Sequence, residues 1–279
     1  MHELKDYLAR VNTGFAKNQR NGVVFFTVPA FEQTGLVRHG FTSRIGGVST
    51  GCFESLNLSC KRENDPENIL KNFRIAAEAI GVDAQSLVLC RYEHGINVEF
   101  ADERHLGMGI WRENELPFCD GVAVTDAGIT AVTIHADCNP IFFMDKKGRA
   151  AGVCHAGWRG TYGNVIGTIV KKFASKSIAP ADILLGFGPS IGPCCFEVQE
   201  DVGGLFAEKF GETVRSFRQG RQYVDLWSVL ALEAMEAGIP PENVTMSRLC
   251  TYCEKQLFYS HRRDAGKTGA MGSFIQLVK

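Results

Sequence analysis

Cys138 and His155 are the residues best suited to chemistry in this chain. Cys138 stands in the run HADCNP (residues 135–140), and His155 opens the run HAGWRG (residues 155–160). Two apolar segments separated by a turn at residues 145–148 lie between them. Two such segments form a hairpin, so we expect it to bring the two side chains together. A thiolate beside an imidazole makes either a metal site or a nucleophile–base pair.

A second imidazole, His94, also follows a strand-like segment and precedes a glycine. With Cys138 and His155 it makes a set of three ligands. Zinc held by three protein ligands keeps a fourth position for water and lowers the pKa of that water to about 7. The spacing matches no short zinc motif. A buried cysteine with two hydrogen-bonded histidines and a Cys138–His155 catalytic pair therefore remain alternatives.

Polar residues near these three ligands suggest further roles. Asp137 can orient a histidine or accept a proton, or it can be a turn aspartate. Arg159 and Arg44 are our candidates for binding an anion such as phosphate. Ser43 and Arg44 open a glycine-rich loop whose backbone N–H groups can approach a ligand, although a tight turn with a surface arginine explains the loop equally well.

Three other features have structural interpretations beside functional ones. Trp158 and Phe187 can form a stacking wall for a flat ligand or belong to the core. The charged run at residues 262–264 is interpreted as self-paired. Cys250 and Cys253 form a CxxC motif with no second pair to complete a zinc ribbon, which favours a structural or incidental role over a redox one.

Composition restricts the class of protein. The chain has 279 residues, 45% hydrophobic residues and a net charge of -1. The absence of a basic stripe argues against a nucleic-acid partner, and no apolar run is long enough for a membrane span. The first 20 residues lack an apolar secretory segment, so we expect a cytoplasmic protein acting on small molecules. The sequence does not indicate its oligomeric state.

The positions of the expected elements predict one mixed α/β domain. Strands and helices interleave without a regular βαβ order, which argues against a doubly wound parallel fold. Helices are expected at residues 66–80, 165–173, 198–210 and 226–237. Strands are expected at residues 23–28, 36–41, 55–58, 87–90, 98–100, 121–125, 130–134, 141–144, 149–155, 183–187 and 271–278.

Several motifs occur in an order that resembles the YfiH/laccase-domain family. They are SRxGGVS (43–49), SLNL (55–58), HG (94–95), ADCxP (136–140), HAGWRG (155–160), GPxIGP (188–193) and RRD (262–264). The resemblance covers residues 22–278. It implies an α+β fold, a single-domain sandwich with mixed β-sheets similar to the catalytic domain of cytotoxic necrotising factor. That domain would span residues 22–279, after an N-terminal extension at residues 1–21.

The resemblance also implies an activity. The family was named for polyphenol oxidation, and its members are described as purine nucleoside phosphorylases with adenosine deaminase activity. It implies zinc held by His94, Cys138 and His155, with adenosine, inosine or methylthioadenosine and phosphate as substrates. In our leading hypothesis Asp137 is catalytic together with Cys138 and His155.

In the same hypothesis Ser43, Arg44 and Arg159 bind the substrate. Three alternatives remain: an amidase that edits peptidoglycan precursors, a copper-dependent polyphenol oxidase and a zinc-stabilised binding module. The seven histidines are few for multicopper chemistry. Departures from the family pattern next to the site, Tyr92-Glu93, His135 and His261, affect expectations about substrate preference.

Overall fold

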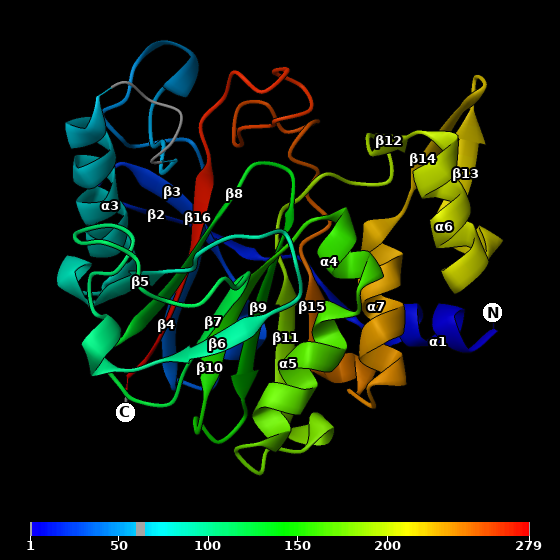
Figure 1. The fold of residues 1–279 in the computed structure, drawn as a ribbon, viewed down its shortest axis with the longest axis horizontal. Helices are drawn as coiled ribbons and strands as arrows, with labels where there is room; N and C mark the ends of the chain where they lie inside the picture. Colours follow the sequence, from blue (N-terminus) through cyan, green and yellow to red (C-terminus); the bar gives the residue numbers. More distant parts are fainter. Residues whose placement is uncertain (1, 60–64, 279) are drawn as a thin grey trace.

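Two large β-sheets lie face to face, and helices cover their outer faces (Figure 1). The computed structural model describes residues 2–59 and 65–278. Side chains of both sheets fill the space between them: Phe41 and Ile275 of one sheet share a core with Phe142 and Val153 of the other. The predicted sandwich with mixed sheets is confirmed.

The larger sheet has seven strands, antiparallel in the centre and parallel toward both edges. In spatial order they are β1 (Asn12–Thr13), β15 (Val244–Met246), β11 (Ile183–Phe187), β9 (Asn139–Asp145), β10 (Ala151–Ala156), β7 (Gly121–Val124) and β6 (Val98–Ala101). Every residue of β9, β10 and β11 is buried, as expected for central strands covered on both faces.

The second sheet has six strands and a single parallel pair, β5 with β8. Its spatial order is β2 (Ala16–Arg20), β3 (Val23–Thr27), β4 (Val37–Thr42), β16 (Met271–Leu277), β8 (Thr130–His135) and β5 (Leu87–Leu89). A small third sheet consists of β12 (Glu197–Val198), β14 (Arg221–Val224) and β13 (Arg215–Arg218).

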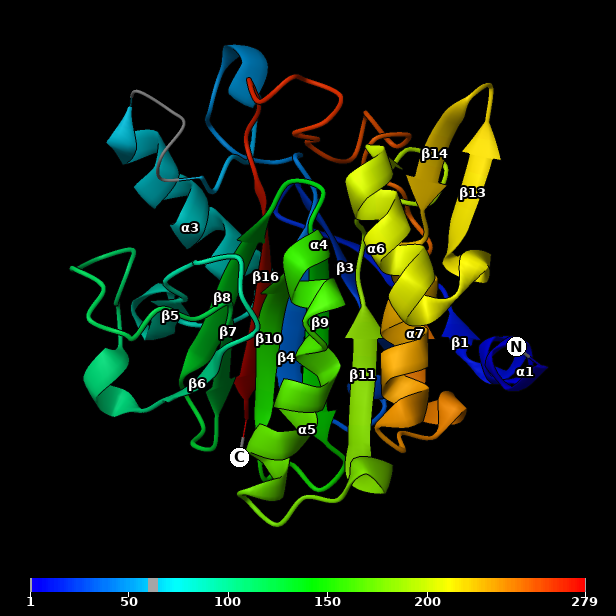
Figure 2. The ribbon, with the colours of Figure 1, turned by 45° about the vertical axis from the view of Figure 1, so that its right-hand side comes forward.

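Helices form the outer layers (Figure 2). Helix α3 (Pro66–Ile80) packs on the six-stranded sheet, while α1 (His2–Arg10), α5 (Val165–Ala174) and α7 (Leu226–Glu236) pack on the seven-stranded sheet. The others are α2 (Pro29–Glu32), α4 (Trp158–Tyr162) and α6 (Glu200–Phe210). Within the described residues, no helix combines the length and apolarity that crossing a membrane requires.

Local sequence explains the ends of α3. The Asp65 side chain caps its N-terminus by accepting a hydrogen bond from the Glu67 N–H (3.0 Å), and proline occupies the first helical position. Gly81 ends the helix with φ of 88°, in the left-handed region where glycine is favoured. These are the limits that the sequence predicts.

Two expectations about elements are wrong. The helix predicted at residues 198–210 begins at Glu200, because Val198 pairs with β14. Residues 55–58 form no strand, since their hydrogen bonds go to a loop and a helix. The Leu58 N–H donates to the Ala270 carbonyl (3.0 Å), and the Asn57 carbonyl accepts from the Asn72 amide (2.8 Å).

The first 20 residues contribute to both sheets. The Tyr7 hydroxyl donates to the Ile239 carbonyl (2.8 Å), which holds α1 against the end of α7. Strand β1 then runs parallel to β15, with Asn12 opposite Thr245, and β2 pairs with β3. The boundary predicted between an extension and the catalytic domain stays a prediction.

Candidate metal centre and adjoining pocket

The β9–β10 hairpin places Cys138 beside His155. In its register His155 lies opposite Pro140 and Ala156 lies opposite Asn139. Cys138 immediately precedes β9, so the thiol and the imidazole meet at the same end of the hairpin. His155 is buried, with 4% of its surface exposed. The sequence-based expectation about this hairpin is confirmed.

One buried carboxylate, that of Asp120, brings His94 to the same place. Asp120 accepts hydrogen bonds from the backbone N–H groups of Glu93 (3.3 Å), His94 (3.1 Å) and Gly95 (2.7 Å). It also accepts one from His155 Nδ1 (3.1 Å). Asp120 therefore fixes both the loop that carries His94 and the ring of His155.

The three expected ligands are neighbours around Gly157. A Cβ atom at this position would lie 3.3 Å from Cys138 Sγ and 3.8 Å from His94 Cδ2, so glycine leaves room for both side chains. The rings of His94 and His155 are 5.1 Å apart between centroids and nearly perpendicular, at 88°. Because His155 donates from Nδ1 to Asp120, Nε2 is the ring atom left to bind a metal, which would replace any proton there.

The electrostatics of this centre favour positive charge. Burial by itself lowers the pKa of His155, but the interactions with Cys138 and with the Asp120 carboxylate outweigh burial and raise that pKa to about 10. Burial raises the pKa of Asp120, whereas its hydrogen bonds from His155 and Gly95 outweigh this and hold it below the usual range. Two imidazoles and a thiolate held beside a fixed carboxylate form a donor set suited to zinc.

Two residues of the centre have a left-handed backbone conformation, which residues other than glycine rarely adopt. His94 has φ of 60° and Asp137 has φ of 85°. Such residues cost about 1–3 kcal/mol each and persist where their surroundings hold them. The hydrogen bond to Asp120 holds His94, as described above.

Asp137 is held by residues from distant loops. Its carboxylate accepts from the Thr251 hydroxyl (2.6 Å) and the Arg262 N–H (2.7 Å), and its carbonyl accepts from the Ile191 N–H (2.8 Å). Asp120 therefore makes the contact with a site histidine that the sequence suggested for Asp137. Sequence reasoning missed Asp120, which looks like an ordinary aspartate before a strand.

His135 supports the turn from within the core. It is 1% exposed, and its Nδ1 donates to the Cys138 carbonyl (3.2 Å) while its Nε2 accepts from the Thr133 hydroxyl (2.8 Å). Burial and the nearby charge of His155 lower the pKa of His135 well below its usual value. His135 thus holds the backbone of Cys138 in place through this hydrogen bond.

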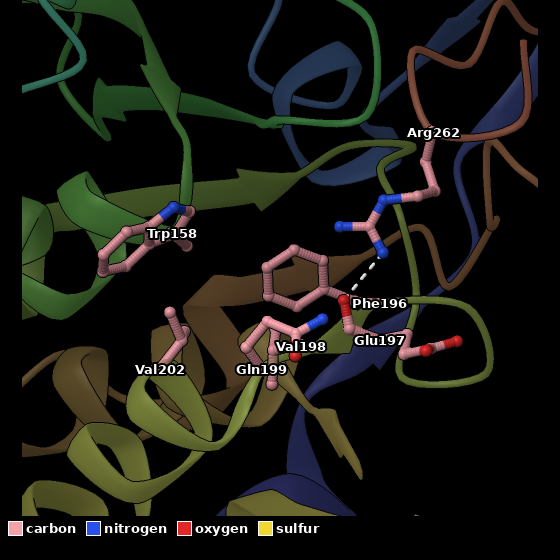
Figure 3. Close-up of a pocket in the computed structure, with 7 residues that line it drawn as sticks. All are labelled: Trp158, Phe196, Glu197, Val198, Gln199, Val202 and Arg262. Carbon is pink, nitrogen blue, oxygen red and sulfur yellow. Dashed lines mark hydrogen bonds between the residues drawn. The ribbon is translucent and has the colours of Figure 1, made fainter. Parts of the chain in front are cut away.

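A pocket of about 380 Å³ adjoins the centre (Figure 3). Trp158, which directly follows Gly157, lies on one side, and Phe196 and Arg262 lie on the other. The Arg262 side chain donates to the Glu197 carbonyl (2.7 Å), while its backbone N–H binds the Asp137 carboxylate. The pocket has the size of a small-ligand site. Two of its lining residues lead to the centre, Trp158 along the chain and Arg262 through its hydrogen bond to Asp137.

The expected substrate residues divide into two groups. Arg159 is exposed, and its guanidinium lies 4.4 Å from the centroid of Trp158 in the pocket wall. Arg44 instead stacks on Tyr259 (4.6 Å) and donates to the Glu54 carbonyl (2.8 Å), and the Ser43 hydroxyl accepts from the Ile45 N–H within its own loop (3.0 Å).

Two assignments change with the structure. Phe187 is 2% exposed and belongs to the core, so Phe196 takes the place facing Trp158. The interpretation of residues 262–264 as self-paired is correct for Arg263, which binds Asp264 at 2.9 Å, but wrong for Arg262. The adjacent acid in the sequence gave no indication of which arginine it would bind.

Residues 38–278 match the family described as multi-copper polyphenol oxidoreductase laccase. The chain belongs to this family. Among solved structures of similar fold is YlmD from Geobacillus stearothermophilus, with a TM-score of 0.87 and 32% identity over 95% of this chain and 99% of that one. Another, the Bacillus licheniformis hypothetical protein YfiH, gives a TM-score of 0.86 and 29% identity over 94% and 98% of the two chains.

Relatives of this chain are named as purine nucleoside phosphorylases and not as oxidoreductases. Purine nucleoside phosphorylase YlmD of Geobacillus stearothermophilus is 35% identical over 242 residues, which cover 85% of this chain and 88% of that protein. Purine nucleoside phosphorylase LACC1 of Mus musculus is 31% identical over 99% of this chain and 62% of that protein.

Proposed function

We propose that this chain is a zinc-dependent purine nucleoside enzyme. It would cleave adenosine, inosine and methylthioadenosine with phosphate and also deaminate adenosine. The observation that carries the proposal is the convergence of His94, Cys138 and His155 beside a pocket with an aromatic wall and an arginine. The names of the relatives support the same substrate class.

His94, Cys138 and His155 would hold the zinc ion, with Asp120 fixing the ring orientation of His155. Three protein ligands leave a position open, where zinc acts as a Lewis acid and lowers the pKa of bound water. Asp120 also keeps His155 in the tautomer that presents Nε2. His135 keeps the Cys138 backbone in place from behind.

The pocket would bind the two substrates by different contacts. The indole of Trp158 offers a flat surface for the purine, and Phe196 closes the opposite side. Arg262 and Arg159 would bind phosphate, because a guanidinium pairs with phosphate oxygens through two parallel hydrogen bonds. Ser43 and Arg44 are not among the residues that line this pocket, and Arg44 stacks on Tyr259 instead.

Glu93 and Asp137 are the acids available for moving a proton. Glu93 is exposed next to His94, and its carboxylate accepts from the Asn97 amide (2.6 Å). Asp137 is 8% exposed, and each of its oxygens already accepts a hydrogen bond. Exposure therefore favours Glu93 as the group that exchanges a proton with water during deamination, while Asp137 positions Cys138 and Arg262.

Cys138→Ala tests the proposal. The purified protein is incubated with adenosine, with and without phosphate, and the products are separated by chromatography. Adenine with ribose 1-phosphate reports phosphorolysis, and inosine reports deamination. We expect Cys138→Ala to lose both activities, with Cys52→Ala, at an exposed cysteine in the short 3-10 helix Gly51–Phe53, unchanged. Full nucleoside cleavage by a Cys138→Ala protein that has lost this zinc would refute the proposal.

A further inference from the structure

Four cysteine thiols meet in a second place on the molecule. Cys194 and Cys195 lie in the loop between β11 and β12, and Cys250 and Cys253 follow β15. The four sulfur atoms all lie within 4.8 Å of one another. The interpretation of Cys250 and Cys253 as a motif without a second pair is therefore wrong, because the fold supplies that pair from a distant loop.

The distances between the sulfurs fit a tetrahedral metal site. Bonds of about 2.3 Å from zinc to sulfur give a tetrahedron whose edges are about 3.8 Å. Cys253 Sγ lies 3.7 Å from Cys194 Sγ and 3.5 Å from Cys195 Sγ. A disulfide requires a separation of about 2.05 Å. The nine cysteines in the described part of the chain are all free thiols, and Cys60 lies outside that part.

Backbone contacts hold the two loops together before any metal binds. The Ser190 N–H donates to the Leu249 carbonyl (3.1 Å), and the Thr251 N–H donates to the Ser190 carbonyl (3.0 Å). The Gly192 N–H donates to Cys250 Sγ at 3.3 Å, a contact that stabilises a thiolate ligand. The site is therefore largely preformed, which lowers the ordering cost of binding.

We propose that Cys194, Cys195, Cys250 and Cys253 bind one zinc ion in a closed, structural site. Four thiolates fill the tetrahedron and leave no position for water, in contrast to the centre at Cys138. Binding replaces the thiol protons, which are released to solvent, and requires no oxidant or reductant.

This second site would stiffen the catalytic pocket. The loop of Cys194 and Cys195 continues directly into Phe196 of the pocket wall. The loop of Cys250 and Cys253 carries Thr251, whose hydroxyl binds the Asp137 carboxylate. A metal that joins the two loops would therefore fix one wall of the pocket and the turn before Cys138.

Metal analysis of purified variants tests the inference separately from the proposed function. We expect about two zinc ions per chain in the wild type, about one in Cys138→Ala and about one in the double variant Cys194→Ser/Cys253→Ser. Cys52→Ser, at an exposed thiol outside the cluster, should keep the wild-type content. If the first centre bound no zinc, the double variant alone would still lose its zinc. A double variant with as much zinc as the wild type would overturn the inference.

A second measurement avoids the risk that the double variant fails to fold. Cobalt(II) is exchanged into Cys138→Ala, where only the four-cysteine site remains. We expect the strong sulfur-to-cobalt charge-transfer absorption of a tetrahedral site with four thiolates. Alkylation mapped by mass spectrometry should show these four cysteines protected by metal and reactive after chelation. Equal alkylation with and without metal, or a disulfide within the cluster, would contradict a zinc site.

Discussion

Replacing Asp120 by asparagine tests how the candidate metal centre is built. The two carboxylate oxygens divide their partners evenly. Oδ1 accepts from His155 Nδ1 and the His94 N–H, and Oδ2 accepts from the Glu93 and Gly95 N–H groups. An asparagine side chain keeps one oxygen and places an amide donor at the other position. In either orientation two of the four donors face another donor.

The size of the effect follows from these contacts. A buried donor left without an acceptor costs about 1–3 kcal/mol, and relaxation of the loop reduces the sum, so we expect a loss of about 2–4 kcal/mol in the free energy of unfolding. The metal centre should suffer as well, because losing the partner that orients a ligating histidine lowers metal affinity about 10–100-fold. By the usual conversion this is about 1.4–2.7 kcal/mol.

The pH dependence has a definite sign. Hydrogen bonds hold the pKa of Asp120 in the folded protein below its usual value although burial raises it. The unfolded chain therefore binds a proton first as pH falls. The contribution of Asp120 to stability is complete above pH of about 4 and is lost as pH falls through the pKa of the folded state. Asp120→Asn should remove this contribution.

Two assays measure these effects. Urea unfolding followed by circular dichroism gives stability, and competition with a chromophoric chelator gives zinc affinity. Asp126→Asn, at an exposed position in the turn between β7 and β8, is the matched control. If Asp120→Asn unfolds at the wild-type urea concentration and binds zinc within about twofold of the wild type, Asp120 does not hold the centre as described.

Three further changes have defined outcomes. Burial raises the pKa of Glu233 to about 8, so the free energy of unfolding falls as pH rises from about 4.5 to 8. Glu233→Gln should remove this pH dependence. In urea unfolding at pH 8 the variant should be more stable than the wild type by about 2–4 kcal/mol. Burial lowers the pKa of His39 to about 3, so the free energy of unfolding falls as pH drops below about 6.5. This decrease amounts to at most about 1.4 kcal/mol per pH unit, and His39→Gln should remove it. Arg262→Ala should raise the KM for phosphate about tenfold or more and spare phosphate-independent deamination, measured by steady-state kinetics.

Each of these changes has a control at an exposed or remote position. Glu236→Gln lies on the same helix as Glu233, at an exposed position. His105→Gln replaces a partly exposed histidine that pairs with Asp102. Arg104→Ala removes an arginine that pairs with Asp102 far from the pocket. A Glu233→Gln protein that keeps the wild-type pH slope, or an Arg262→Ala protein with an unchanged KM for phosphate, would contradict the respective reasoning.

The parts of the fold that the sequence predicts are those governed by local patterns. The hairpin that joins Cys138 to His155 follows from two apolar segments and a turn, and α3 follows from its caps. Short strands such as β1 and β15 carry too few residues for a pattern and exist because they pair with neighbours, β15 with β11 and β1 with β15. The segment at residues 55–58 has a strand-like composition, but its backbone hydrogen bonds go to Ala270 and Asn72 and not to a strand.

For the site, the sequence indicates the residue types but not which distant groups they meet. The contact between Asp120 and His155 and the meeting of Cys195 with Cys253 both join segments far apart in the chain. Arg262 and Arg263 are adjacent and chemically identical, yet one faces the pocket and the other pairs with Asp264. Only the packed fold distinguishes them.

The short strand β1 protects an edge of the larger sheet. Without residues 12–14, β15 would present unpaired backbone groups, among them the Met246 carbonyl that accepts from the Gly14 N–H (2.9 Å). Exposed edges of this kind are templates for pairing with another chain. The N-terminal segment therefore covers an edge that could otherwise pair with another chain. A fusion or cleavage point upstream of β1 leaves that cover in place, whereas one within β1 removes it.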